Sequence, residues 1–169
     1  MNARPVAMIL VLAAAVLGGC AGFDGRGLVA GQSSEAEVVA LMGAPSHRIA
    51  LPNGDSALYF SRLPEGRSVY VVKLGPNGVM KSIEQRLVRA NLRFVFVGTS
   101  TKKDVLELFG PAGRVSRDPR RPLESWEYKY YELGNWRVFW VQFSDDGVVR
   151  DLIDMVDWEL DKPGALQGM

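Results

Sequence analysis

Hydrophobic positions recur at helical spacing in two short segments of the chain, residues 35–42 and 102–109. In each segment three apolar residues fall at i, i+3 and i+4, which places them on one narrow stripe of a helix. The stripes consist of Val38, Leu41 and Met42 in the first segment, and of Val105, Leu108 and Phe109 in the second. The pattern predicts two helices of about two turns each, which are too short to persist without packing on another element.

The ends of both segments carry the same signals. Before each helix stands a hydroxyl residue with an acid three positions later, as in a capping box: Ser34 with Glu37, and Thr101 with Asp104. Gly43 and Gly110 supply the left-handed position at which helices often end. The capping box, the apolar stripe and the terminating glycine recur together in both segments. Residues 31–43 and 98–110 therefore indicate two copies of one supersecondary unit.

β-rich runs follow each helix in the same order. They predict strands at 56–60, 69–74 and 79–83 in the first copy and at 125–130, 138–143 and 148–153 in the second, with hairpin signals at 76–78 and 145–147. Residues 92–97 predict one further strand that leads into the second helix. We therefore expect an α+β fold of two tandem units, residues 31–90 and 91–160, each with short helices packed on a small antiparallel β-sheet.

One strand is apolar on both faces. Side chains alternate between the two faces of a strand. The core face, covered by a helix, should therefore carry Phe139, Val141 and Phe143. The opposite face should carry Trp136, Val138 and Trp140. The matching strand of the first copy has charged residues at the ends of this opposite face. Two alternatives follow. The aromatic face is buried between the two units, or it is an exposed partner-binding site made of Trp136, Val138 and Trp140.

The N-terminus indicates where the protein works. Arg4 precedes an apolar stretch, residues 5–17, that is shorter than the roughly 20 residues of a membrane span. The stretch ends in Leu-Gly-Gly-Cys, which resembles the lipobox of a bacterial lipoprotein signal peptide. We expect a signal peptide at 1–19, lipidation of Cys20, a flexible tether over 20–30 and a loose tail at 161–169. Ala21, by resemblance to enteric lipoproteins, favours the outer membrane.

Composition and spacing offer little chemistry. The net charge of +1 does not suggest a nucleic-acid partner, and no His/Cys/Asp cluster has the spacing of a zinc site. His47 is the only histidine and is expected in a solvated loop. Asp151, Asp154 and Asp157 could form a calcium site but are more simply solvated carboxylates. The arginines at 117, 120 and 121 form a basic loop, also expected to be solvated. We expect no enzyme activity, no cofactor and no metal.

The motif Gly-x-[Ser/Thr]-[Ser/Thr]-x-x-[Glu/Asp]-Val-x-x-Leu-x-Gly, followed by an aromatic strand and a glycine-centred turn, resembles the SmpA/OmlA (BamE-like) family of outer-membrane lipoproteins. The resemblance implies a lipid-anchored, periplasm-facing protein on the outer membrane. Its partner would be a subunit of the β-barrel assembly machinery, which it would support as an accessory or scaffold factor. Tandem copies also resemble the β-lactamase inhibitor protein, which implies an alternative function as an inhibitor or ligand-binding module using the aromatic sheet face.

Overall fold

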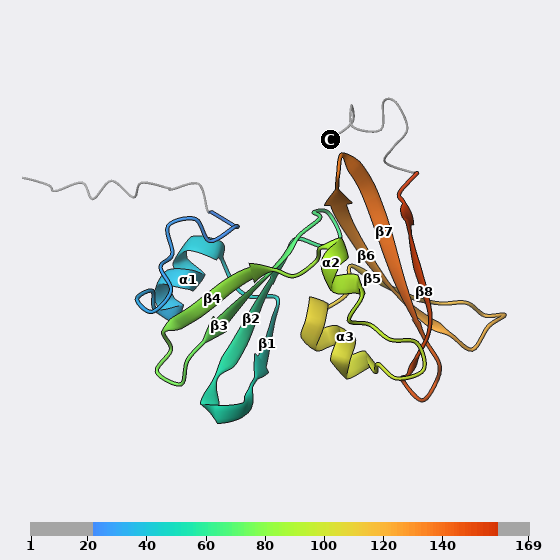
Figure 1. The fold of residues 1–169 in the computed structure, drawn as a ribbon, viewed down its shortest axis with the longest axis horizontal. Helices are drawn as coiled ribbons and strands as arrows, with labels where there is room; N and C mark the ends of the chain where they lie inside the picture. The colour runs from blue at the N-terminus through green and yellow to red at the C-terminus, as the bar shows by residue number, and fades with distance from the viewer. Residues whose placement is uncertain (1–21, 159–169) are drawn as a thin grey trace, which may run out of the picture.

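The fold consists of two four-stranded antiparallel sheets and a few short helices (Figure 1). It was obtained as a computed structural model that describes residues 22–158; the expected signal peptide, Cys20 and the tail at 161–169 lie outside them. The first half contains α1 (Glu35–Met42), β1 (His47–Ala50), η1 (Pro52–Gly54), β2 (Ser56–Ser61), β3 (Val69–Leu74) and β4 (Met80–Gln85). The second half contains α2 (Arg89–Leu92), α3 (Lys102–Phe109), β5 (Arg114–Arg117), β6 (Glu124–Glu132), β7 (Asn135–Phe143) and β8 (Val149–Val156). Strands that follow one another in the chain are paired, in the orders β1-β2-β3-β4 and β5-β6-β7-β8.

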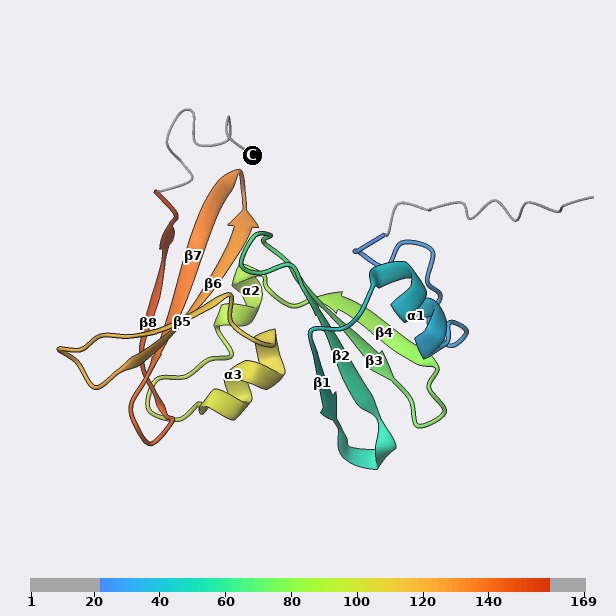
Figure 2. The same cartoon turned by 180° about the vertical axis from the view of Figure 1, so that it is seen from behind.

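The expected fold class, two tandem units of short helices on a small sheet, is wrong. The structure is sheet-rich, with 41% of the described residues in strands and 17% in helices. One reason is that the sequence pattern missed β1 and β5, whose four residues each are too short to show a clear alternation. The other reason is that α3 is not the cover of a single sheet, because it lies between the two sheets (Figures 1 and 2).

The capping boxes are confirmed. The Ser34 hydroxyl accepts from the Glu37 amide at 3.3 Å while the Glu37 carboxylate accepts from the Ser34 amide at 2.7 Å. The same two bonds join Thr101 and Asp104, at 3.3 and 2.8 Å. In both helices the capping bond holds the pKa of the acid below its usual range, because the carboxylate accepts the backbone hydrogen bond of the cap.

Glycine ends both helices, but not in the left-handed helical conformation that the sequence predicted. Gly43 has φ +88° and ψ −170°, and Gly110 has φ +75° and ψ −168°. This combination of positive φ with extended ψ is open essentially to glycine alone. The chain therefore leaves each helix in an extended direction and runs straight into the loop before β1 or β5.

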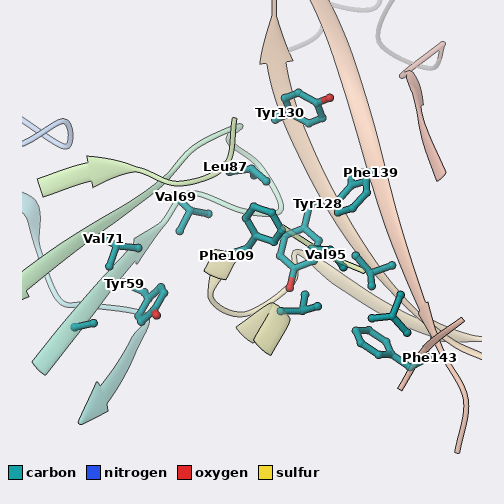
Figure 3. Close-up of a cluster of buried hydrophobic side chains, with 14 residues drawn as sticks. Tyr59, Val69, Val71, Leu87, Val95, Phe109, Tyr128, Tyr130, Phe139 and Phe143 are labelled. Carbon is teal, nitrogen blue, oxygen red and sulfur yellow. The ribbon is translucent and has the colours of Figure 1, made fainter. Parts of the chain in front are cut away.

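Two hydrophobic cores stack the elements into four layers, in the order α1, first sheet, α3, second sheet (Figures 1 and 2). The smaller core joins α1 to one face of the first sheet through buried Val38 and Met42 and through Leu58, Phe60, Val72, Leu74 and Met80. The larger core joins α3 to both sheets (Figure 3). Phe109 of α3 lies in it with Val69 and Val71 of the first sheet and Tyr128 and Phe139 of the second. Because one core contains side chains from both halves, the two halves form a single packed body.

Residues 92–97 do not form the strand that their composition predicted. They continue from α2 into turns, and the Ser100 hydroxyl accepts from the Phe96 amide at 2.9 Å. Val95 is the one residue of the run that is buried, whereas Phe94, Phe96 and Val97 are at least half exposed. The run therefore has neither the strand partner nor the covered face that a strand needs.

Residues 22–30, which the composition predicted as part of a flexible tether, are packed together with Gly31 against the first half. Phe23 and Leu28 contact the smaller core, and the ring of Phe23 meets that of Tyr70 edge-on at 6.0 Å. The Gly31 amide donates to the Met80 carbonyl at 2.8 Å, which ties this segment to β4. The folded body thus begins within two residues of Cys20.

Candidate surface for protein contacts

The second sheet has two unlike faces. Its inner face turns toward α3 and carries the aromatic core residues, of which Tyr128, Tyr130, Phe139 and Phe143 are labelled in Figure 3. The opposite face, here called the outer face, carries Trp136, Val138 and Trp140 of β7. Cross-strand pairing sets Trp140 opposite Glu127 and Val138 opposite Lys129 on β6. The sequence-predicted partner residues therefore lie together on one face, which points away from α3 and from the first sheet.

The two sheets differ in what covers this face. In the first sheet the corresponding residues of β3, Val69 and Val71, are buried in the larger core beneath α3. In the second sheet no helix of the described chain, residues 22–158, lies over the outer face (Figures 1 and 2). Val138 is nevertheless only 2% exposed, while Trp136 and Trp140 are half-buried. Burial between the two halves, one of the two alternatives left open by the sequence, is not what the structure shows.

A cavity of about 350 Å³ opens on the outer face, lined by Arg114, Glu127, Lys129, Val138, Trp140, Asp157 and Trp158. Four of the side chains that line it are joined in two pairs by a hydrogen bond and an ion pair. The Trp140 indole N–H donates to a Glu127 carboxylate oxygen at 2.9 Å, and the Lys129 ammonium lies 2.9 Å from the Asp157 carboxylate. Because the Asp157 side chain is only 5% exposed, its ion pair with Lys129 is shielded from water. The cavity thus has a fixed aromatic wall and a fixed polar rim.

Arg67 extends from the β2–β3 loop of the first half to this face. Its guanidinium carbon lies 5.5 Å from the centre of the Trp136 ring, within range of a cation–π interaction. Burial lowers the pKa of Arg67, and the nearby carboxylates of Asp157 and Glu127 act in the opposite direction. Tyr131, which is 54% exposed, also contacts Trp136, with the two ring centres 4.8 Å apart and the ring planes tilted by 57°. The outer face is therefore an aromatic surface with cations from both halves of the chain.

This composition suits protein contacts. Tryptophan, tyrosine and arginine are the residues that most often dominate binding energy at interfaces, when a polar rim surrounds them. Sequence reasoning placed the three residues of β7 on one face but did not connect Glu127, Lys129, Asp157 or Arg67 with them. Alternation along β6 would have put Glu127 and Lys129 on one face, but only the register with β7 shows which face that is. No local signal brings Arg67 to Trp136, because they lie in different halves.

The other residues singled out in the sequence do not form a site. Asp154 lies on the inner face, where it accepts from the Tyr130 hydroxyl at 2.8 Å and pairs with Arg137 at 2.9 Å. Asp151 and Asp157 point to the other side, so the three aspartates do not converge. Within residues 22–158 no group of three or more His, Cys, Asp or Glu residues could hold a metal ion.

Two further residues of the sequence analysis have structural contacts. His47 belongs to β1 rather than to a loop, with its ring 5.7 Å from that of Tyr59. Arg117 pairs with Asp145 at 2.9 Å and with Glu124 at 3.6 Å, and it lies in β5 at the start of the basic loop. Neither residue lines the cavity of the outer face.

A second cavity, of about 510 Å³, lies where the described chain begins and is lined by Gly22, Phe23, Asp24, Arg26, Leu41, Arg62, Ser68 and Tyr70. The Arg62 guanidinium covers one face of the Phe23 ring at 4.3 Å. Arg26 pairs with Asp24 at 3.2 Å, on the surface. This cavity therefore belongs to the junction between the N-terminal segment and the first sheet.

Comparison with known proteins assigns no family. No family model and no curated protein sequence matches the chain. Among solved structures, a DUF4309 family protein (YjgB) from Bacillus subtilis is similar at 17% sequence identity. The match covers 76% of this chain and 81% of that one, with a TM-score of 0.29. Between residues 22 and 158, none of the helices has the length and apolarity needed to cross a membrane.

Proposed function

We propose that this chain is a non-enzymatic outer-membrane lipoprotein that faces the periplasm, anchored through Cys20, and that acts as an accessory or scaffold factor. Its work would be in β-barrel protein assembly or in envelope integrity, as in the BamE-like family that its sequence motifs resemble. The observation that carries the proposal is the outer face of the second sheet. It is an aromatic surface over which no described helix lies, although the matching face of the first sheet is covered by α3.

The N-terminal sequence supports the membrane location. The apolar stretch that ends in Leu-Gly-Gly-Cys is too short for a comfortable span and has the form of a lipoprotein signal. The packed segment at residues 22–31 leaves little free chain after Cys20, so acyl groups at this residue would hold the folded body close to the bilayer. In Figures 1 and 2, α1 and the start of the described chain lie at one end of the long axis and the second sheet at the other. The outer face would then be presented away from the anchor.

Copurification from detergent-solubilised membranes tests the proposal. Tagged wild-type protein should recover a subunit of the β-barrel assembly machinery, and the Trp140→Ala variant should recover less of it while remaining folded. Leu133→Ala, at an 85% exposed turn position between β6 and β7, serves as the matched control. Recovery of no assembly-machinery subunit would refute the proposed partner. Mass spectrometry of the mature protein would refute the anchor if the thiol of Cys20 carried no acyl groups.

The cavity beside Trp140 favours one alternative, an inhibitor or ligand-binding module like the β-lactamase inhibitor protein. An exposed loop of a target could insert a side chain into a space of about 350 Å³ with an aromatic wall. The probe for this function is a purified β-lactamase assayed in the presence of the protein. Inhibition by wild type that is lost in Trp140→Ala would favour the alternative over the scaffold, and unchanged enzyme activity would exclude it for that target.

A further inference from the structure

The α2–α3 loop, residues 93–101, repeats a turn of the segment that precedes α1. The Phe96 amide donates to the Ser100 hydroxyl at 2.9 Å, just as the Val29 amide donates to the Ser33 hydroxyl at 3.0 Å. The Ser100 amide donates back to the Phe96 carbonyl at 2.9 Å, and the Ser33 amide to the Val29 carbonyl at the same distance. The two halves of the chain therefore build one turn twice.

A glycine ties each of these turns to the neighbouring sheet. The Gly98 amide donates to the Val149 carbonyl of β8 at 2.8 Å, and the Gly31 amide donates to the Met80 carbonyl of β4, also at 2.8 Å. Both glycines have φ +79°. Because these bonds join backbone to backbone, they hold with whatever side chains the turn carries. The exposed side chains can therefore differ between the two copies without a change of the turn.

The exposed side chains of the α2–α3 loop are larger and more apolar than those of its counterpart. Phe96 and Val97 are 58% and 55% exposed, at the positions where the first copy has the smaller Val29 and Ala30. Phe94, two residues earlier, is 50% exposed. Since the first copy forms the turn without bulky apolar groups, the fold does not require them in the second. Exposed apolar side chains gathered in one loop indicate a contact surface.

The chain around this loop is basic. Between residues 86 and 103 the sequence has five cations, Arg86, Arg89, Arg93, Lys102 and Lys103, and no aspartate or glutamate. Carboxylates from outside this segment pair with four of them. Arg93 is exposed and forms no ion pair with another residue of the described chain, 22–158. The loop therefore offers apolar groups together with an uncompensated positive charge, which fits a surface that is negative outside and apolar inside.

The arrangement of the loop favours a lipid surface over a second protein. In Figure 1 the chain between α2 and α3 runs out beside β8 before it turns back into α3. Neither the cavity of the outer face nor the cavity at the start of the described chain is lined by a residue of the loop. The Arg93 guanidinium carbon lies 4.9 Å from the centre of the Phe94 ring. At a bilayer surface such a pair places the ring among the first methylene groups and the cation among the phosphates.

We propose that the α2–α3 loop inserts into the surface of an anionic lipid bilayer, as a second membrane contact besides the anchor at Cys20. Phe94, Phe96 and Val97 enter the boundary between headgroups and acyl chains, and Arg93 lies among the phosphate groups. The inference rests on the proposed function in taking the membrane as the surface at which the protein works. Two points of contact fix the orientation of the folded body on the bilayer, whereas the anchor alone leaves it free to turn.

Cosedimentation with lipid vesicles tests the inference. A form beginning at Ala21 keeps every described residue and both cores, and lacks the anchor residue. It should bind vesicles of two parts phosphatidylcholine and one part phosphatidylserine, and bind pure phosphatidylcholine more weakly. Leu133→Ala is the matched control, because it removes an 85% exposed apolar side chain at the β6–β7 turn and should bind like wild type.

Two variants of the loop separate the apolar from the electrostatic contribution. The triple variant Phe94→Ala, Phe96→Val, Val97→Ala should lower partitioning onto the mixed vesicles by about tenfold or more, since apolar area drives insertion. Its valine and alanine at 96 and 97 are the residues of the first copy, so the turn should persist, and circular dichroism checks it. Arg93→Gln should lower partitioning onto the mixed vesicles by about fivefold and leave binding to pure phosphatidylcholine almost unchanged.

A wild type that binds neither kind of vesicle overturns the inference, and so does a triple variant that binds as well as wild type. If wild type ignores vesicles while the triple variant recovers less of an envelope protein in copurification, the loop is a protein contact and the inference is wrong. If the triple variant is unfolded, Arg93→Gln decides, and partitioning equal to that of wild type refutes the inference. The vesicle samples contain no acylated cysteine and no other protein, so their result is separate from both tests of the proposed function.

Discussion

Two glycines at equivalent positions allow the packing of α3 between the sheets to be measured directly. Gly43 and Gly110 both end a helix with positive φ and extended ψ, so replacing either by alanine should cost about 1–3 kcal/mol in backbone strain. They differ in their surroundings. A Cβ at Gly43 meets open space, whereas a Cβ at Gly110 would lie 2.9, 3.4 and 3.5 Å from three atoms of Tyr59.

The difference between the two variants isolates the contact with the first sheet. The Tyr59 ring is only 2% exposed and its hydroxyl is bonded to the Glu107 carbonyl, so it cannot move aside freely. Overpacking in a dense core typically costs about 1–3 kcal/mol. Gly110→Ala should therefore lower the free energy of unfolding by about 1–3 kcal/mol more than Gly43→Ala does. Because the backbone strain is common to both variants, it cancels in this comparison.

Urea denaturation of both variants, followed by far-UV circular dichroism, gives the two free energies. A double-mutant cycle with Tyr59→Ala adds the internal check, since removing the ring should reduce the cost of Gly110→Ala to that of Gly43→Ala. Equal costs in the two single variants would refute the account, and so would a cycle without coupling. In either case the end of α3 would not rest on the first sheet as described.

Three further predictions concern polar contacts of the described residues. Tyr59→Phe should lower the free energy of unfolding by about 0.5–1.5 kcal/mol through loss of the bond to Glu107, and urea denaturation measures it. Hydrogen bonding from Lys102 and Trp126 lowers the pKa of Glu124, so its stabilising contribution is complete above the unfolded value of about 4.5 and is lost as pH falls through the lower folded pKa. Unfolding midpoints between pH 3 and 6 should accordingly fall less in Glu124→Gln than in wild type. Burial raises the pKa of Tyr130 to about 12, so the stabilisation that its neutral phenol contributes is complete below pH 10 and is lost as pH rises through 12. In a spectrophotometric titration, the Tyr130→Phe variant should show one late-titrating phenol fewer than wild type.

The parts of the fold that depend on local signals could be predicted from the sequence. The capping boxes of α1 and α3 formed as expected, because a hydroxyl and an acid three residues apart act within one turn. The core face of β7 was also found, since Phe139, Val141 and Phe143 are all at most 2% exposed. Alternation along a strand needs no knowledge of the rest of the chain.

The parts that depend on distant contacts could not be predicted. A four-residue strand such as β1 or β5 is formed by its neighbour in the sheet, so its own sequence carries little signal. The position of α3 between two sheets depends on apolar surface on both of its sides, and periodicity showed only one stripe. Residues 92–97 had strand composition but no strand to pair with. The expected helix-on-sheet units failed for these reasons.

In the candidate surface too, some residues could be predicted from local signals and others depend on distant contacts. Trp136, Val138 and Trp140 follow from alternation along one strand. Lys129 and Asp157 come from two different strands, and their ion pair requires the register on both sides of β7. Arg67 reaches Trp136 across the boundary between the halves, and its distance in sequence gave no indication of this contact.

The central claim is that the two halves form one body, with the larger core shared between them. All four tryptophans lie in the second half, and of these Trp136 contacts Arg67 of the first half, so tryptophan fluorescence reports mainly on the second half. Leu58 is fully buried in the core that α1 shares with the first sheet, and Leu58→Ala should lower the free energy of unfolding by about 2–5 kcal/mol. The account predicts one transition in urea, in which fluorescence and circular dichroism shift by the same amount. A fluorescence midpoint that stays at its wild-type value while circular dichroism shows two steps would contradict it.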